Sequence, residues 1–235
     1  MNAPSSTHRP PGWLSQARLL LMKDLRIEVR TGEVVTTSAF FAVLVVILSS
    51  MAFYGGVSTR RLVASGALWL SVAFAAVLAI GRTWQRERDE AALIGLLTSP
   101  LSPSALFAGK ALGVLLFLFV VEIVVVPLTA LFFSLELGEV GLGVIVIALF
   151  ATPGIAASGT LFGAMTVRTR ARDLVLATVL FPLLSPCLLS AVVATRELLD
   201  GARLHELTDY FMLLGVFDLV FIAGGLGLFE ALIRD

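Results

Sequence analysis

The chain has 235 residues, of which 58% are hydrophobic and 14% are charged, and its mean hydropathy is +0.97. A soluble domain is about half apolar and about one quarter charged, so this composition excludes an ordinary soluble domain. The 17 basic and 17 acidic residues cancel, which gives no support for nucleic-acid binding. The single cysteine, Cys187, excludes an internal disulfide.

The N-terminal region carries no apolar segment of the kind found in a secretory signal. Residues 1–12 are rich in proline and serine and are expected to form a disordered tail. Residues 13–30 show a helical pattern, and we expect a basic amphipathic helix in the membrane interface, with packing on a partner protein as the alternative. One side of this helix is apolar (Leu14, Ala17, Leu21, Leu25), and the other is basic (Lys23, Arg26, Arg30).

Six continuous apolar stretches of 19 to 26 residues follow. A helix needs about 20 apolar residues to cross a hydrocarbon core of about 30 Å, whereas the strands of a membrane barrel would alternate over about 10 residues. The sequence therefore predicts an all-α membrane protein with six transmembrane helices, forming one membrane domain over residues 13–235. The spans are expected at 34–54, 62–80, 111–135, 142–167, 174–195 and 210–233.

Basic residues gather on one side of this six-span arrangement. Thirteen of the 17 lysines and arginines lie in the N-terminal segment, the connection between spans two and three, the connection near residue 170 and the C-terminal tail. The other side holds Arg60, Arg61, Arg196 and Arg203. Since lysine and arginine mark the cytoplasmic side, both termini are expected in the cytoplasm.

The longest polar connection, residues 81–103, is charged at its start and apolar towards its end, where Pro100 and Pro103 stop it. We predict a short cytoplasmic helix between spans two and three, with Ser102 capping the helix that follows. Its apolar face suits docking on a partner protein or on lipid, although a solvated loop explains the pattern equally well. The candidate coupling residues are Arg82, Arg86, Glu87, Arg88, Asp89, Glu90, Leu93, Leu96 and Leu97.

Two carboxyl groups are predicted inside the membrane: Glu122 near the middle of span three, and Asp218 about 12 Å inside span six at 1.5 Å per residue. A charged residue there costs roughly 2.5–3.5 kcal/mol, so each should face other helices or a wet cavity. A functional contact and a simple bond to a neighbour both remain open. Gly159 and Gly163 form a G-x-x-x-G pair, which favours close helix packing within the chain over a dimer seam.

The inventory of residues argues against catalysis. The nearest approach to a phosphate-binding loop, residues 104–111, lacks the first glycine and the final hydroxyl of that motif, so any ATP must be handled by a partner. Intramembrane proteolysis by a Ser–His pair would need a histidine within a span, and both histidines, His8 and His205, lie outside the spans. Haem ligation by His205 is possible chemistry, but a lone loop histidine is usually solvated, and neither a catalytic nor a metal site is expected.

The charged segment ending in EAALIGLLTSP at Pro100 resembles the coupling segment of ABC-2-type permeases. Three further stretches narrow the resemblance: KDLRIEVR at Lys23–Arg30, the run from Thr152 to Ala191, and the closing run from Phe217 to Asp235. Together they are similar to the haem exporter protein B (CcmB) family of cytochrome c maturation, over roughly residues 19–235. One departure is Ala91–Ala92, where the general pattern of ABC-2-type permeases often has a glycine.

The resemblance implies a permease subunit in the bacterial inner membrane that works with a separate cytoplasmic ATPase, CcmA. It also implies the membrane partners CcmC and CcmD, haem as the cargo and delivery to the chaperone CcmE. The general architecture of ABC complexes suggests two copies of this chain per complex. The subunit would either move haem or release haem-loaded chaperone. An ABC-2 permease for another lipophilic cargo and a membrane assembly subunit that transports nothing remain alternatives.

Overall fold

The computed structural model describes residues 11–53, 55–89, 101–166 and 172–234, and every regular element in these ranges is a helix. In chain order the elements are α1 (Trp13–Thr31), α2 (Glu33–Ala52), α3 (Val57–Asp89), α5 (Pro103–Phe133), α6 (Leu137–Thr166), α7 (Arg172–Leu199), the 3₁₀ turn η1 (Leu204–Leu207) and α8 (Thr208–Arg234). The predicted all-α class is confirmed.

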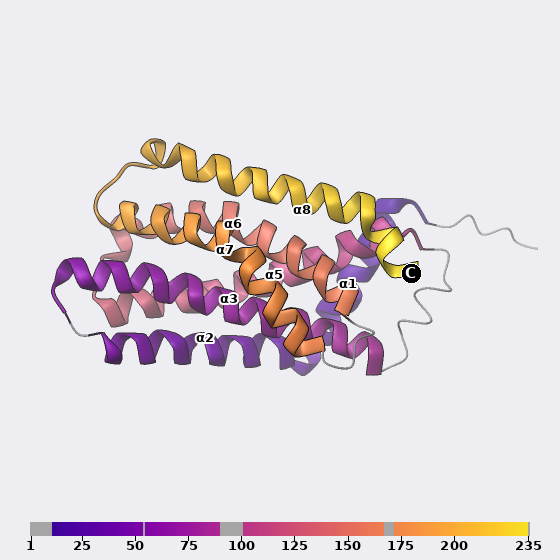
Figure 1. Ribbon diagram of the computed structural model, residues 1–235. Helices are drawn as coiled ribbons and strands as arrows, with labels where there is room; N and C mark the ends of the chain where they lie inside the picture. Colours follow the sequence, from indigo (N-terminus) through magenta and orange to yellow (C-terminus); the bar gives the residue numbers. More distant parts are fainter. Residues whose placement is uncertain (1–10, 54, 90–100, 167–171, 235) are drawn as a thin grey trace, which may run out of the picture.

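Six of the described helices, α2, α3, α5, α6, α7 and α8, are long and apolar enough to cross a membrane. They lie side by side (Figure 1), so the chain is a multi-pass membrane protein, as predicted. One end of the bundle, called the α1 end here, holds α1, the last turns of α3 and the start of α5. The opposite end, called the far end, holds the turns near residues 55, 135 and 202 (Figure 1).

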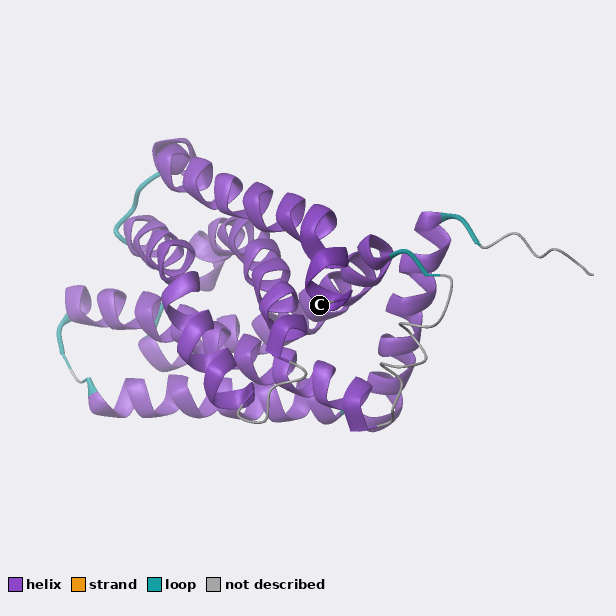
Figure 2. Ribbon diagram, turned by 45° about the vertical axis from the view of Figure 1, so that its right-hand side comes forward, coloured by secondary structure: helices purple, strands orange, loops and turns teal. Residues whose placement is uncertain are grey.

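Helix α1 lies across the end of the bundle and does not run along it (Figure 2). The change of direction occurs at Gly32, which has a positive φ of 62° and caps the end of α1 by donating its N–H to the carbonyl of Glu28. Glycine adopts this left-handed conformation without the steric cost that a Cβ brings. A single glycine thus ends the surface helix and begins the first span.

The sequence placed the end of span two at Ile80, but α3 continues without a break to Asp89. The charged residues from Arg82 to Asp89 are therefore an extension of the second span, not the start of a separate helix. Charge ends an apolar stretch but does not end a helix, because arginine and glutamate are good helix formers. The remainder of the predicted coupling segment, including Glu90, Leu93, Leu96 and Leu97, lies outside the described residues.

The start of α5 follows the sequence prediction. Ser102 has an extended backbone, its side chain accepts a hydrogen bond from the N–H of Ala105 at 3.3 Å, and Pro103 occupies the first helical position. Proline has no N–H to lose there, and its fixed φ suits a helix. These two residues fix where the third span begins.

The interior of the bundle depends on small residues where helices cross. Gly159 and Gly163 of α6 lie against α3, so closely that an added Cβ would come within 2.0 Å of Ile80 Cδ1 and 2.5 Å of Trp84 Cδ1, respectively. Farther along α3, the indole N–H of Trp69 donates to Thr195 Oγ1 at 2.8 Å in a buried contact with α7. Helix α3 is thus held on two sides within the core.

Candidate functional site: a buried ion network at the α1 end

The face of α1 that packs on the bundle carries acidic side chains. Asp24 and Glu28 are buried along with Ala17 and Leu20, while Leu14 is 76% exposed. The inward stripe therefore carries two carboxylates. Burying a charge is costly unless it is paired, and the pairing comes from helices distant in the sequence.

Lysine 110, in the second turn of α5, is the main partner of Asp24. Its side chain is only 1% exposed, and its ammonium lies 2.9 Å from Asp24 Oδ2 and also binds the carboxylate of Glu87 from α3. Glu87 accepts a second ion pair from Lys23, which lies 3.5 Å from Asp24 as well. We call Lys23, Asp24, Glu87 and Lys110 the ion network. Two positive and two negative charges make it neutral, and it joins α1, α3 and α5.

The ion network changes the proton affinities of its members. Burial by itself raises the pKa of Glu87, but the neighbouring charges and hydrogen bonds of Lys110 and Lys23 outweigh it, so the pKa lies below its ordinary value. Burial lowers the pKa of Lys23, and the bonds and charges of Glu87 and Asp24 raise it above its ordinary value. Both groups are thus held in their charged forms.

Aromatic rings close the ion network on its inner side. The Lys110 ammonium lies 5.9 Å from the centroid of the Trp84 ring, within the range of a cation–π contact. Trp84 packs on Phe229 of α8 at 6.4 Å, and Phe107 packs on the same ring at 5.4 Å. Lys110 and Glu87 are only 1% and 3% exposed, and this burial strengthens the Coulomb attraction between them.

Close backbone approach brings α1 to α5. A Cβ at Gly109 would lie 2.7 Å from Leu20 Cβ and 2.8 Å from the carbonyl oxygen of Ala17. Glycine is therefore required at this position for the two helices to approach so closely. On the other flank, a side-chain oxygen of Glu28 accepts the N–H of Val35 at 2.8 Å and so holds the first turn of α2.

The structure separates the predicted coupling residues. Arg82 lies on the outside, 2.7 Å from Glu33 Oε1, with both side chains more than 40% exposed, whereas Glu87 turns inward and is 3% exposed. Arg86, Arg88 and Asp89 belong to α3, but their side chains lie outside the described part. Sequence reasoning missed Lys110 and Asp24, although the stripe of Ala17, Leu20, Asp24 and Glu28 at three- and four-residue steps was visible.

The two intramembrane carboxyl groups lie apart from the ion network. Glu122 is 6% exposed and accepts a hydrogen bond from Thr152 Oγ1 of α6 at 2.6 Å. Asp218 of α8 lies against Gly154, where an added Cβ would come within 2.3 Å of Asp218 Oδ1. Each carboxyl therefore contacts α6 from a different side.

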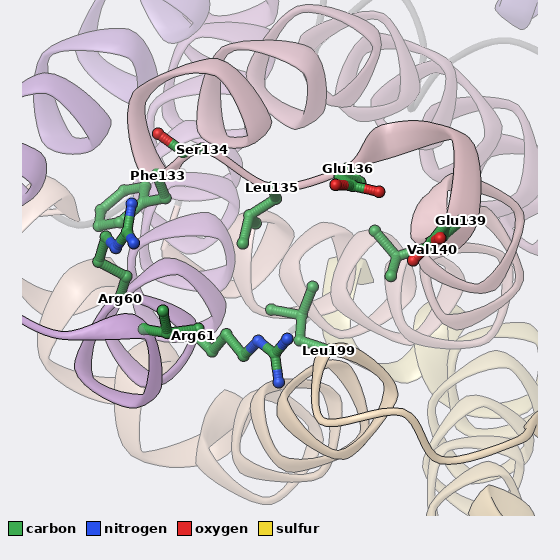
Figure 3. Close-up of a pocket in the computed structure, with 10 residues that line it drawn as sticks. Arg60, Arg61, Phe133, Ser134, Leu135, Glu136, Glu139, Val140 and Leu199 are labelled. Carbon is green, nitrogen blue, oxygen red and sulfur yellow. The ribbon is translucent and has the colours of Figure 1, made fainter.

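A pocket of about 440 Å³ opens at the far end (Figure 3). Arg60 and Arg61 lie on one side of it and Glu136 and Glu139 on the other (Figure 3), and Arg61 pairs with Asp200 at 3.3 Å. The ten lining residues that the structure describes include no histidine, cysteine, methionine or tyrosine, the side chains that ligate haem iron. The described lining is thus of mixed charge and supplies no axial ligand for haem.

The far-end histidine is likewise separate from this pocket. The side chain of His205, in η1, is 72% exposed and lies 3.9 Å from Glu206 Oε1. Its exposure agrees with the expectation of a solvated loop residue.

Comparison with known proteins identifies the family. The family model described as CcmB protein matches residues 15–229, which is most of the chain. The chain belongs to the CcmB family. All four members of the ion network and both intramembrane carboxyl groups lie within the matched region.

Proteins similar to this CcmB-family chain include three that carry the name Heme exporter protein B. The protein of Rhodobacter capsulatus is 28% identical over 188 residues, covering 80% of this chain and 86% of its own length. That of Bradyrhizobium diazoefficiens is 27% identical over 184 residues (77% and 82%), and that of Paracoccus denitrificans is 26% identical over 185 residues (79% and 84%). The resemblance seen in the sequence is therefore confirmed for nearly the whole CcmB-family domain.

Proposed function

We propose that this chain is the membrane permease subunit of a haem export system that serves the biogenesis of c-type cytochromes. The observation that carries this proposal is the CcmB-family match over residues 15–229, together with relatives named Heme exporter protein B that align over more than four fifths of their own length. The six transmembrane helices fit such a subunit. Residues 13–235 act as one permease domain.

A separate cytoplasmic ATPase, similar to CcmA, supplies the energy in this proposal. The chain itself is not expected to hydrolyse ATP, because its sequence lacks a phosphate-binding loop. The α1 end carries the basic residues that mark the cytoplasmic side, so both termini face the cytoplasm and the far end faces the periplasm of a bacterial inner membrane. Membrane partners similar to CcmC and CcmD complete the complex, and a second copy of this chain joins it.

The ion network supplies a mechanical link for this coupling. The ATPase acts on the segment that begins at Arg82, and α3 ends within that segment, at Asp89. Glu87 connects the end of α3 to Lys110 of α5 and, through Lys23, to α1. Because buried and paired charges resist separation, a displacement of the end of α3 also displaces α1 and α5.

The proposal is tested by replacing the native gene in a bacterium that makes c-type cytochromes. Haem staining should show that the wild-type chain restores these cytochromes and that the empty vector leaves them at least about tenfold lower. The double charge reversal R86E/R88E should abolish the turnover of the co-purified ATPase, while R196E at the far end serves as the matched control. Full cytochrome levels without the chain would contradict the proposal.

A second measurement separates the two ways in which the subunit could serve haem delivery. Purified complex in vesicles either accumulates haem on the far side upon ATP addition, or discharges haem-loaded chaperone from its membrane partner without net haem movement. Export of another lipophilic cargo, or an assembly role without transport, predicts neither result.

A further inference from the structure

The ends of four spans meet at the pocket at the far end. Val57 begins the span in α3, Phe133 ends the span in α5 and Leu199 ends the span in α7, and all three residues line the pocket. The span in α6 begins at Gly138, next to the lining residue Glu139. Polar lipid headgroups lie directly outside the hydrocarbon that a span crosses. The pocket, with a volume of about 440 Å³, is therefore at headgroup depth and large enough for a small ligand.

One arginine of this pocket has an unused hydrogen-bond donor. The Nε of Arg60 is buried and makes no hydrogen bond within the part of the chain that the structure describes. Its neighbour Arg61 pairs with Asp200 at 3.3 Å, but both of those side chains are more than one third exposed. A buried donor without an acceptor destabilises a protein, and a guanidinium pairs best with a carboxylate or a phosphate. Arg60 thus favours an anionic group in the pocket.

The opposite side of the pocket is anionic. Glu136 and Glu139 are exposed there, and they lie across the pocket from the two arginines (Figure 3). Among the ion pairs of the described residues, none joins either glutamate to Arg60 or Arg61. A purely anionic ligand would meet the two carboxylates, and a purely cationic ligand would meet the two arginines. The separated charges therefore complement a ligand that carries both signs.

We propose that this pocket binds a phosphoethanolamine group, with its phosphate at Arg60 and Arg61 and its primary ammonium at Glu136 and Glu139. The position at the span ends makes the headgroup of a membrane lipid the expected source, and a free phosphoethanolamine compound shares the same chemistry. A primary ammonium donates hydrogen bonds to carboxylates, whereas the methylated ammonium of a choline headgroup has no N–H to donate. This inference goes beyond the proposed function and does not depend on which cargo is moved.

Native mass spectrometry of the full chain, purified in detergent, tests the proposal. The chain is mixed with equal amounts of dioleoyl phosphatidylethanolamine, phosphatidylcholine and phosphatidylglycerol. We expect one phosphatidylethanolamine to be retained per chain, about tenfold above either other lipid. Arg60→Gln should lower this retention about tenfold, as the loss of a hydrogen bond to a charged group predicts. Arg203→Gln, which removes an exposed cation at the same end outside the pocket lining, should leave it unchanged.

The double variant E136Q/E139Q distinguishes recognition from damage to the fold. Removing the two carboxylates should abolish the preference for phosphatidylethanolamine and raise the retention of phosphatidylglycerol, and a misfolded chain would not gain a ligand. Equal retention of the three lipids by the wild type together with no effect of free phosphoethanolamine, or a retention unchanged by Arg60→Gln, would overturn the proposal.

A thermal-shift measurement with soluble phosphoethanolamine distinguishes the two sources. Lipid retention without a shift identifies a lipid headgroup, whereas a shift that Arg60→Gln removes, without lipid retention, identifies a free compound. Haem staining of c-type cytochromes reports the proposed function separately, so the two proposals can fail independently.

Discussion

Replacing Lys110 with methionine should lower the melting temperature of the protein far more than replacing an exposed cation at the same end of the bundle. The change keeps the length of the side chain but removes the charge that pairs with Asp24 and Glu87. Both carboxylates stay buried, with only the half-exposed Lys23 to balance them. The cost is therefore that of leaving an uncompensated buried charge.

The size of the effect follows from burial and distance. Two unit charges 2.9 Å apart attract by about 6 kcal/mol at an effective dielectric constant of about 20, and desolvation offsets part of this gain. Removing one partner of a buried pair costs about 3–5 kcal/mol, which corresponds to a melting temperature roughly 6–20 °C lower for a chain of this size. Because Lys110 is 1% exposed, solvent screening does not reduce this cost.

Arg82→Met is the matched control. The pair of Arg82 with Glu33, at 2.7 Å, is shorter than the pair of Lys110 with Asp24, but both of its side chains are more than 40% exposed. An exposed pair contributes only about 0–1 kcal/mol. Thermal denaturation of the purified proteins in detergent, followed by size-exclusion chromatography of the surviving fraction, measures both variants. Equal melting temperatures for the Lys110 and Arg82 variants would refute the reasoning. The double variant K110M/E87Q should recover part of the loss, because the remaining Lys23–Asp24 pair is neutral.

Three further outcomes are expected from the same denaturation assay. The pKa of Glu87 lies below its ordinary value of 4.5. The stabilisation from its charge is therefore full above pH 4.5 and is lost as the pH falls through the lower pKa of the folded state. Glu87→Gln should flatten the decline in melting temperature on acidification, and an unchanged decline would contradict the assignment. Gly163→Ala places a methyl group against the Trp84 ring and should cost about 1–3 kcal/mol, whereas Gly227→Ala, which meets nothing within 4 Å, should be neutral or slightly stabilising; similar losses in both would argue against the tight crossing. Trp69→Phe removes the donor to Thr195 and should cost about 1 kcal/mol, visible as a lower melting temperature than the wild type.

The six spans could be predicted because a polar residue is costly in lipid, so a long apolar stretch marks a span. The ends of the helices were harder to predict. The apolar run ends at Ile80, where the hydrocarbon would end, whereas the helix continues to Asp89 because its backbone hydrogen bonds do not depend on apolar side chains. Hydropathy locates the membrane boundary, while capping residues such as Ser102 locate the helix boundary.

The ion network could not be predicted in the same way. Lys110 was interpreted as one of the basic residues on the cytoplasmic side, and its position near a span boundary supports that interpretation. Its pairing with Asp24 spans 86 positions of the sequence, and neither periodicity nor composition reports such a contact. The inward face of α1 was not predicted for the same reason, since a stripe containing Asp24 and Glu28 looks solvent-facing until its partners are known.

The close contact at Gly109 has a mechanical consequence. A Cβ at Gly109 would lie 2.7 Å from Leu20 Cβ and 2.8 Å from the carbonyl oxygen of Ala17, so α1 cannot slide along the third span without first moving away from it. That movement would separate the buried Lys110 from Asp24. A partner that binds α1 and displaces it would therefore also displace α5. The displacement would reach Glu122, because Gly109 and Glu122 belong to the same continuous helix.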